Sequence, residues 1–326
     1  MFAQMEAVRL EALHLAHDPR TGLRAVIAIH NTRLGPALGG CRFLTYADED
    51  AAIRDAMRLA QGGGKAVIMR PPYLSDRAAL FEAFGRMVES LGGRYITAVD
   101  SGTSSADMDC VARQTTHVTS TSRGGDPSAH TALGVFSGIR ATALARLGSD
   151  DLEDLRIAVQ GLGHVGYALV ELLAAAGAEL LVSDHNPGLV QLAVEQFGAH
   201  PVPSEALLAT PCDILAPCGL GGVFNSLTVG QLRCAAVAGA ANNQLIYPDI
   251  ADELEARGIL YAPDYVINSG GLIYVSLQHE GAPPERITAQ MAEIPRRLTD
   301  IYAHAQAEKR SPARVADQQA EKLLYG

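Results

Sequence analysis

The stretch that decides the fold is residues 156–184, RIAVQGLGHVGYALVELLAAAGAELLVSD. Its short apolar run, 157–159, predicts a buried parallel strand, since such strands are covered on both faces. Glycines follow at GxGxxG spacing, at Gly161, Gly163 and Gly166. A helical pattern comes next, and a second apolar strand ends the stretch. Strand, glycine turn, helix and strand in this order predict a dinucleotide-binding βαβ unit.

Each glycine of this turn has a physical task. Gly161 permits the tight turn from strand to helix, Gly163 lets the backbone approach a pyrophosphate, and Gly166 allows the helix to pack closely on the strand. The residues between them, Leu162, His164 and Val165, complete the expected cofactor turn. Because the first N–H groups of a helix have no partner within it, the diphosphate is expected at the helix start. A tight turn without a ligand is the alternative interpretation.

Asp184 lies at the end of the second strand, roughly 20 residues beyond the turn, where an acidic residue binds the ribose hydroxyls of NAD. Its negative charge would repel the 2′-phosphate of NADP, and the next residue is His185, not an arginine. The sequence therefore predicts NAD as the cofactor.

Composition limits the class of protein. The chain has 326 residues, enough for two domains, with 48% hydrophobic and 19% charged residues, typical of a soluble α/β protein. A net charge of −10 argues against nucleic acid and acidic membranes as partners. The five cysteines form no CxxC pair, and no third ligand accompanies His14 and His17, so no metal site is predicted. Without a basic leader or a long apolar run, we expect a cytoplasmic protein.

The order of patterns predicts an α/β fold of two domains. We expect a substrate-binding and catalytic domain at 1–130, a doubly wound NAD-binding domain at 131–275, and C-terminal helices at 276–326 that pack back toward the first domain. Within the first domain we expect a hairpin, a glycine-rich loop, two helices and two strands, at 12–17 with 23–30, 35–40, 48–59 with 76–91, and 66–69 with 95–99. Later elements are expected at 131–147, 212–216, 235–239, 259–262, 286–309 and 313–324.

Three loops at successive strand ends, 216–222, 239–244 and 262–271, are rich in small residues and asparagine. Small residues let a flat nicotinamide lie close to the backbone, and ligands bind at the carboxyl ends of strands in such sheets. Taken singly, these are ordinary loop residues. In the first domain, Lys65 follows three glycines and Asp100 follows a strand, which suggests a base and a group that binds a substrate ammonium. An exposed turn lysine and a helix-capping aspartate are the simpler alternatives.

A set of motifs spread over nearly the whole chain identifies a family. GPALGGCR at 35–42, GGGK at 62–65, DxGT at 100–103, GxG at 161–163 and APDYVIN at 262–268 occur in the order found in amino-acid dehydrogenases. The chain resembles the Glu/Leu/Phe/Val dehydrogenases, and among them the leucine dehydrogenases most.

This resemblance implies NAD-dependent oxidative deamination of a branched-chain L-amino acid, leucine or valine, to its 2-oxo acid and ammonia, by a homo-oligomer. L-Phenylalanine is the alternative substrate. The catalytic residues that match are Lys65, which would activate water for attack on an imine, and Asp100 at the substrate amine. Residues that match the substrate pocket are Leu38, Gly39, Gly40, Val266 and Leu272. Cofactor positions beyond the glycine turn and Asp184 are Thr131, Cys218, Ala241, Asn243 and Asn268.

The chain departs from the family pattern in one place. In the family a segment carrying the lysine that binds the substrate α-carboxylate precedes the GGGK turn, whereas here Gln61 runs directly into it. Three explanations remain open. The segment exists in the protein but is absent from the recorded sequence, or it is truly deleted and the enzyme is impaired. In the third, Arg58 or Arg42 supplies the positive charge of the missing lysine. A noncatalytic NAD-binding regulator is therefore the second hypothesis. Intact-mass measurement against 34.4 kDa would separate the first explanation from the others.

Overall fold

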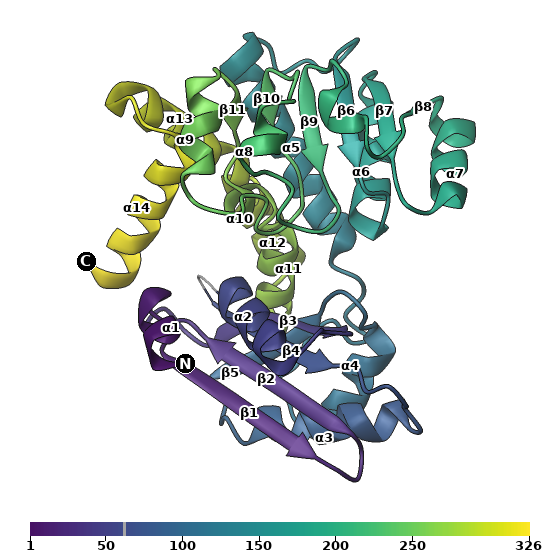
Figure 1. The fold of residues 1–326 in the computed structure, drawn as a ribbon, viewed down its shortest axis with the longest axis vertical. Helices are drawn as coiled ribbons and strands as arrows, with labels where there is room; N and C mark the ends of the chain where they lie inside the picture. The colour runs from purple at the N-terminus through teal and green to yellow at the C-terminus, as the bar shows by residue number, and fades with distance from the viewer. Residues whose placement is uncertain (61–62) are drawn as a thin grey trace. The chain divides into compact units, whose positions relative to one another are not determined.

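The computed structural model describes residues 1–60 and 63–326, and its chain divides into two units. The first unit consists of 1–126, 275–283 and 324–326, and the second of 127–274 and 284–323. Each unit contains one β-sheet with helices around it (Figure 1). The predicted two-domain α/β class is confirmed.

The first unit is built on a five-stranded mixed sheet in the order β1-β2-β4-β3-β5. β1 and β2 form the expected antiparallel hairpin, β2 pairs antiparallel with β4, and β3 pairs parallel with both β4 and β5. The elements are α1 (Phe2–Ala7), β1 (Ala12–Asp18), β2 (Leu23–Ile29), β3 (Ala37–Leu44), α2 (Glu49–Leu59), β4 (Gly64–Met69), α3 (Arg77–Glu89), β5 (Tyr95–Val99) and α4 (Ser105–Ala112).

Both faces of this sheet are buried, because residues alternate between them along each strand. On one face Ala28, Val67 and Met69 pack with the apolar side of α2. On the other, Ile27, Phe43 and Ile68 pack with α3 and α4. α2 begins where Asp48 accepts a hydrogen bond from the N–H of Ala51 at 2.7 Å, a cap that satisfies a free helix donor.

The second unit contains a six-stranded, wholly parallel sheet in the order β11-β10-β9-β6-β7-β8. Its first elements are α5 (Ser128–Leu147), β6 (Arg156–Gln160), α6 (His164–Ala175), β7 (Glu179–Ser183), α7 (Pro187–Phe197), β8 (His200–Pro201), a 3₁₀ turn (Leu207–Ala209), β9 (Ile214–Pro217), α8 (Ser226–Val229), β10 (Ala236–Val237), α9 (Ile250–Ala256) and β11 (Leu260–Tyr261). The order reverses between β6 and β9, which defines the crevice where a doubly wound sheet binds ligands.

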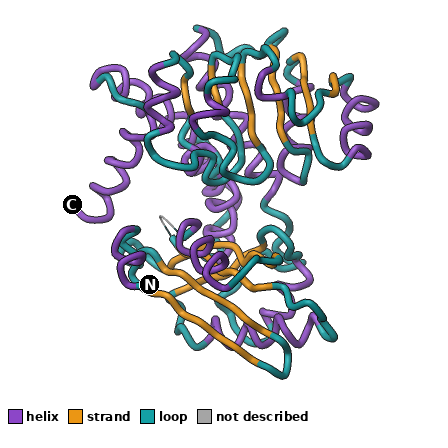
Figure 2. The backbone as a smooth tube through the Cα atoms, viewed as in Figure 1, coloured by secondary structure: helices purple, strands orange, loops and turns teal. Residues whose placement is uncertain are grey.

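The chain ends in α10 (Asp264–Ile267), α11 (Gly270–His279), α12 (Pro284–Met291), α13 (Glu293–Glu308) and α14 (Pro312–Tyr325). These helices and the alternation of strands and helices before them are visible in Figure 2. The division assigns 284–323 to the second unit, and of the expected C-terminal segment 276–326 it assigns 276–283 and 324–326 to the first. The physical reason is the core: Ile294, Leu298 and Tyr302 of α13 are buried with Ile139 of α5.

Candidate active site and dinucleotide-binding turn

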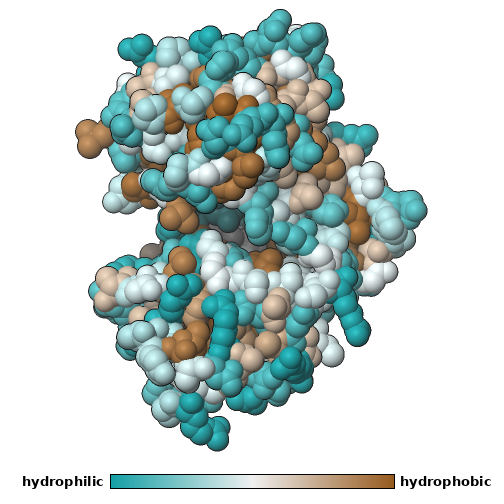
Figure 3. Space-filling view, turned by 90° about the vertical axis from the view of Figure 1, so that its right-hand side faces the viewer, coloured by the Kyte–Doolittle hydropathy of each residue, from teal (hydrophilic) through white to brown (hydrophobic). Residues whose placement is uncertain are grey.

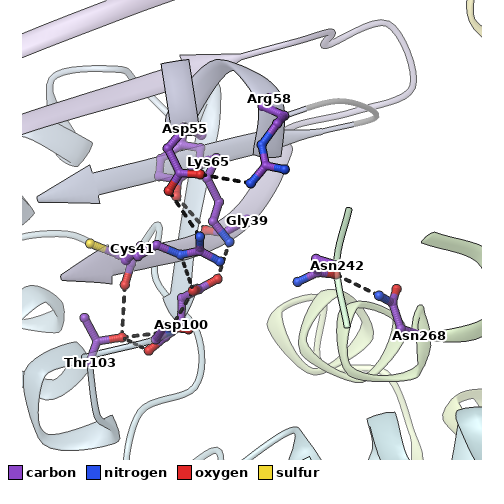
Figure 4. A network of polar contacts seen from close by, with 12 residues as sticks. Gly39, Cys41, Asp55, Arg58, Lys65, Asp100, Thr103, Asn242 and Asn268 are labelled. Atoms are coloured by element: carbon purple, nitrogen blue, oxygen red, sulfur yellow. Dashed lines mark hydrogen bonds and ion pairs between the residues drawn. The ribbon is translucent and has the colours of Figure 1, made fainter. Parts of the chain in front are cut away.

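Lys65 and Asp100 come from strands on either side of β3. Lys65 is the second residue of β4, and Asp100 directly follows β5. The parallel register pairs Cys41 of β3 with Ala66 on one side and with Val99 on the other. Lys65 and Asp100 therefore share one face of the sheet, the face on which α2 packs. Their side chains form an ion pair across β3, from Lys65 Nζ to Asp100 Oδ2 (Figure 4).

Glycines on β3 make room for this pair. A Cβ on Gly40 would lie 2.8 Å from the Asp100 carboxylate, and one on Gly39 would lie 1.7 Å from the carbonyl oxygen of Gly64. The prediction of a loop at 35–40 is thus wrong from residue 37 onward, because the glycines belong to a strand pressed between two neighbours. Leu38 lies beside them on the same strand and is half-buried.

A chain of ion pairs extends from Lys65 and Asp100 to α2. Arg42 donates from Nε to Asp100 Oδ1 and from Nη1 to Asp55 Oδ2, both at 3.1 Å. The side chains of Arg42, Asp55, Lys65 and Asp100 are only 12%, 16%, 7% and 12% exposed. Two cations and two carboxylates are therefore held together with little water, which strengthens their attraction.

These contacts set the ionisation of the group. Burial alone would raise the pKa of Asp100, but Lys65 and Arg42 outweigh it and hold that pKa far below its ordinary value. Burial lowers the pKa of Arg42, and the two carboxylates more than reverse this. Burial and the hydrogen bond from Tyr46 to Asp55 raise the pKa of the tyrosine hydroxyl. Asp100 is therefore an anion and Tyr46 a neutral donor throughout the physiological range.

Sequence reasoning did not identify Asp55 and Tyr46 as part of the site, and it treated Arg42 only as a substitute for a missing charge. Arg42 lies two residues after Gly40 on β3, so the alternation of a strand would have placed it on the face of Lys65. Asp55 could be found only through the packing of α2. Asp55 also accepts a hydrogen bond from Arg58 at 3.3 Å, and Arg58 is 45% exposed. With Arg58 included, the site has three cations and two carboxylates.

The connection that departs from the family pattern joins α2 directly to β4. Gly63 donates its N–H to the carbonyl of Ala60 at 2.9 Å, and its own carbonyl accepts from His30 at 2.9 Å. Gln61 and Gly62, and with them part of the GGGK motif, lie outside the described residues. The short connection is thus anchored by backbone hydrogen bonds at its β4 end.

In the second unit, the glycine turn follows β6 as expected. Gly161 has φ +95°, a conformation that favours glycine. A Cβ on Gly166 would lie 1.9 Å from the carbonyl oxygen of Gly161, whereas one on Gly163 would meet no atom within 4 Å. His164 begins α6 and Val165 packs on the core. The turn is therefore tightly packed between Gly161 and Gly166, whereas the space beside Gly163 is empty, as the approach of a pyrophosphate requires.

Asp184 directly follows β7 and is half-buried. Its Oδ2 accepts the N–H of Leu162 at 2.6 Å, and its Oδ1 accepts the N–H of Asn186 at 2.7 Å. The carboxylate thus ties the strand end to the glycine turn. Gly163 is the N-cap of α6 and, as a glycine, supplies no side-chain cap, so no side chain covers the start of this helix, the end of a helix that attracts anions. These residues fit a dinucleotide.

The ends of β9 and β10 lie beside this turn. A Cβ on Gly166 would be 3.2 Å from the Cβ of Cys218, which follows β9. Ala241 donates its N–H to Pro217 at 2.8 Å, and Asn243 has φ +49°. Asn268 donates from Nδ2 to Asn242 at 2.7 Å (Figure 4). The cofactor candidates Gly161, Cys218, Ala241 and Asn268 are therefore linked along one edge of the sheet.

The third of the expected loops is largely helical. Residues 264–267 form α10, and α11 begins at Gly270. Gly271 packs so closely on α5 that a Cβ there would lie 2.3 Å from the hydroxyl of Thr131, another cofactor candidate. The two pocket candidates differ: Val266 is half-buried and Leu272 is 51% exposed. Both belong to the second unit, whereas Leu38, Gly39 and Gly40 belong to the first.

Among the residues that the structure describes, no helix has the length and apolarity that crossing a membrane requires. Across residues 1–60 and 63–326, no group of three or more His, Cys, Asp or Glu side chains could hold a metal ion.

A parallel sheet of Rossmann order with an open glycine turn, accompanied by a separate α/β unit with a buried lysine–aspartate pair, defines a two-domain dinucleotide-dependent dehydrogenase. Residues 11–117 match the family model described as Glu/Leu/Phe/Val dehydrogenase, dimerisation domain. Residues 185–322 match the model Glutamate/Leucine/Phenylalanine/Valine dehydrogenase. The chain belongs to the Glu/Leu/Phe/Val dehydrogenase family, a family of NAD(P)-dependent amino-acid dehydrogenases.

Comparison with individual proteins leads to the same family. The chain is 42% identical over 341 positions to leucine dehydrogenase of Geobacillus stearothermophilus, covering 99% of this chain and 93% of the relative. It is 43% identical over 337 positions to valine dehydrogenase of Streptomyces albus, covering 96% and 92%. Among solved structures, L-tryptophan dehydrogenase of Nostoc punctiforme matches with a TM-score of 0.80 and 37% identity, covering 99% and 98%. Because the first alignment has more positions than this chain has residues, the leucine dehydrogenase carries residues that have no counterpart here.

Proposed function

We propose that this enzyme catalyses the NAD-dependent oxidative deamination of branched-chain L-amino acids, leucine and valine, to the 2-oxo acid and ammonia. The observation that carries the proposal is the buried Lys65–Asp100 pair in a chain of this family. The leucine and valine dehydrogenases among its relatives support an aliphatic substrate. Val266 and Leu272 are proposed to contact that side chain, together with Leu38, Gly39 and Gly40.

NAD is proposed as the cofactor because the carboxylate of Asp184 lies beside the glycine turn. It would accept hydrogen bonds from the ribose hydroxyls, and the N–H groups at the start of α6 would hold the pyrophosphate. Thr131, Cys218, Ala241, Asn243 and Asn268 are proposed to line the nicotinamide end. When bound, NAD supplies the acceptor for the hydride leaving the substrate α-carbon.

Lys65 and Asp100 are proposed to perform the proton transfers. Asp100, held as an anion by Lys65 and Arg42, would orient the substrate amine. When the amine binds, Lys65 would be released from part of this pairing and lose its own proton to solvent, and the neutral amine would then take a proton from the water that attacks the imine. Asp55 would keep Arg42 in place through their 3.1 Å hydrogen bond.

The substrate α-carboxylate is proposed to bind at Arg58. Arg42 already contacts two carboxylates, whereas Arg58 contacts only Asp55 among the ion pairs of this site and is 45% exposed. The excess of one positive charge among the five groups suits one carboxylate. Arg58 therefore offers the charge of the lysine that the shortened connection lacks.

We propose that the protein forms a homo-oligomer. Large apolar side chains are exposed in both units, among them Leu34, Tyr73, Leu133 and Leu227. On the face drawn in Figure 3, hydrophobic residues form patches between hydrophilic ones. Large contiguous patches mark contact surfaces, and the family model that residues 11–117 match is described as a dimerisation domain. Sedimentation velocity of the purified chain at several concentrations tests this proposal, and a single species at 34.4 kDa would contradict it.

Turnover tests the function. NADH formation is measured at alkaline pH with L-leucine, L-valine, L-phenylalanine and L-glutamate, on protein whose mass agrees with 34.4 kDa. Leucine and valine should react, and glutamate should fail, because none of the proposed pocket residues is a cation. Preference for phenylalanine would select the aromatic alternative. The shortened connection favours a noncatalytic NAD-binding regulator as the second candidate, and NAD binding without turnover of any of the four would establish it.

A further inference from the structure

Two cysteines lie side by side at the amino ends of β9 and β10, in the second unit. The parallel register pairs Ile214 with Ala236, so two residues earlier Cys212 lies opposite Cys234. Backbone hydrogen bonds continue this pairing before the two strands begin. The N–H of Cys212 donates to Arg233 at 3.2 Å, and the N–H of Ala235 donates to Asp213 at 3.0 Å.

The spacing of these positions suits a disulfide. Neighbouring strands lie about 4.8 Å apart, and disulfides join Cα atoms that are about 4.4–6.8 Å apart. Each thiol is also the neighbour that shifts the pKa of the other most. Both cysteines are partly exposed, so a small oxidant can reach them.

The charges around the two sulfurs differ. Arg257 lies near Cys234, and its Nη2 donates to the carbonyl of Leu232 at 3.0 Å. Asp213 lies next to Cys212 in the chain. The hydrogen bond from Cys212 and the charge of Arg257 lower the pKa of Cys234. The same hydrogen bond, burial and the nearby carboxylate raise the pKa of Cys212. The thiolate therefore forms at Cys234.

We propose that Cys234 and Cys212 form a redox-sensitive dithiol that a hydroperoxide oxidises to a disulfide, with Cys234 as the attacking sulfur and Cys212 as the resolving one. The Cys234 thiolate attacks one peroxide oxygen, the O–O bond breaks, and the other oxygen leaves as an alcohol or water after taking a proton. Cys234 is thereby oxidised to a sulfenic acid. Cys212 then loses its proton and attacks that sulfur, the S–S bond forms, and the sulfenic oxygen leaves with the proton as water.

The remaining cysteines are poorer nucleophiles. Cys41 is fully buried, and burial raises its pKa well above the ordinary value. Burial raises the pKa of Cys218 to about 12 and also raises that of Cys110. Since the thiolate is the reacting form, oxidation should be selective for the pair.

The pair lies at the opposite end of the parallel strands from the glycine turn. β9 begins two residues after Cys212, and the turn contacts Cys218 beyond the other end of that strand. The proposal therefore stands independently of the proposed function, and its test needs no substrate.

The test measures disulfide formation in the full chain. The protein is treated with hydrogen peroxide, unfolded, and its remaining thiols are alkylated with iodoacetamide before mass measurement. Compared with untreated protein alkylated in the same way, we expect three alkylated thiols in place of five, a further loss of two hydrogen atoms beyond the missing labels, and reversal by dithiothreitol. Arg233 separates the cysteines in a tryptic digest, so the disulfide joins the peptide that ends at Arg233 to the peptide that begins at Cys234. Because the first peptide also contains Cys218, the C218S variant must keep the link.

Single variants test the direction of attack. In C212S, Cys234 should stop at the sulfenic acid and react with dimedone, about tenfold faster than Cys110 in the same sample. In C234S, neither the link nor dimedone labelling of Cys212 should appear. C110S is the matched control and should behave as the parent, and circular dichroism verifies that each variant is folded. A parent chain that forms no link, a link that persists in C234S, or equal oxidation of Cys110 would overturn the proposal.

Discussion

At the scale of single residues, the Lys65–Asp100 pair carries the proposed chemistry, and Lys65→Ala tests it. We expect a turnover decrease of about a hundredfold or more with nearly unchanged NAD affinity, because the amine acts on water and imine and not on the dinucleotide. Lys65→Arg is the control: it keeps a positive charge beside Asp100 but cannot act as a base, so it should be equally inactive. Turnover of Lys65→Ala near that of the parent would remove Lys65 from the mechanism.

Arg58→Gln tests the proposed carboxylate site. Loss of a charged hydrogen bond to the substrate should raise KM for leucine by about tenfold or more and change kcat much less. Arg54→Gln is the matched control, because Arg54 is an exposed arginine on the same helix. Equal effects of the two substitutions would mean that Arg58 acts only through the general charge of α2.

Asp184→Ala tests cofactor choice. NAD binding should weaken by roughly 1–3 kcal/mol through lost hydrogen bonds, while NADP binding should not weaken. Because Asp184 also accepts the N–H groups of Leu162 and Asn186, Asp184→Asn serves as the control that keeps an acceptor without the charge. Calorimetric titration with both cofactors gives the answer, and a parent chain that binds NADP as tightly as NAD would contradict the assignment.

At the scale of elements, two glycines of the turn between β6 and α6 are expected to have different roles, one in folding and the other in cofactor binding. Gly166→Ala places a Cβ against the Gly161 carbonyl and should lower the free energy of unfolding by roughly 3 kcal/mol. Gly163→Ala meets no atom and should change that free energy by no more than about 1 kcal/mol, yet weaken NAD binding by occupying the approach of the pyrophosphate. Denaturant unfolding and NAD titration of both variants check this. Equal destabilisation would show that the turn is built differently.

Helices and strands could be predicted from the sequence where neighbouring residues alone determine them. The run at β6, the glycines after it and the pattern of α6 agree, and that unit forms as expected. β3 was missed because its Gly39 and Gly40 resemble a loop until β4 and β5 are placed beside them. The expected helix at 286–309 is two helices, α12 and α13. Pro295 lies in the first turn of α13 and cannot donate a hydrogen bond to the preceding turn.

The candidate site likewise contains residues that local sequence identifies and residues that only contacts between elements reveal. Lys65 and Asp100 were found because each follows a recognisable glycine or strand signal. The ion pairs of Arg42 with Asp55 and Asp100 depend on the register of β3 and on the packing of α2. No spacing in the sequence records such contacts between elements. A site built on strand ends can thus be located from the sequence, while its supporting charges require the fold.

At the scale of the whole molecule, acid should affect the two units in opposite ways. The lowered pKa of Asp100 contributes stability to the first unit that is present above its ordinary value of 3.8 and is lost as pH falls through the folded value. In the second unit, burial raises the pKa of Asp264 and Asp317. Their contribution is fully present below 3.8 and is lost as pH rises through the raised values.

Lowering the pH from about 7 to about 4 should therefore stabilise the second unit, and further acid should destabilise the first. Scanning calorimetry over a pH series measures this. Asp317→Asn keeps an acceptor for the hydroxyl of Tyr265 and should flatten the upper part of the profile. A profile identical to that of the parent would exclude Asp317 as its source.

The passage of α11 from the second unit to the first has a consequence for synthesis on the ribosome. Val275 and Leu277 are buried in the first unit, and Gln278 donates from Nε2 to the carbonyl of Gly124 at 2.7 Å. The first unit therefore lacks part of its interior until residues 127–274, the larger part of the second unit, have been translated. Although the first unit is synthesised first, it cannot complete its fold first. A nascent chain halted before Val275 therefore exposes an incompletely folded N-terminal part to chaperones and proteases.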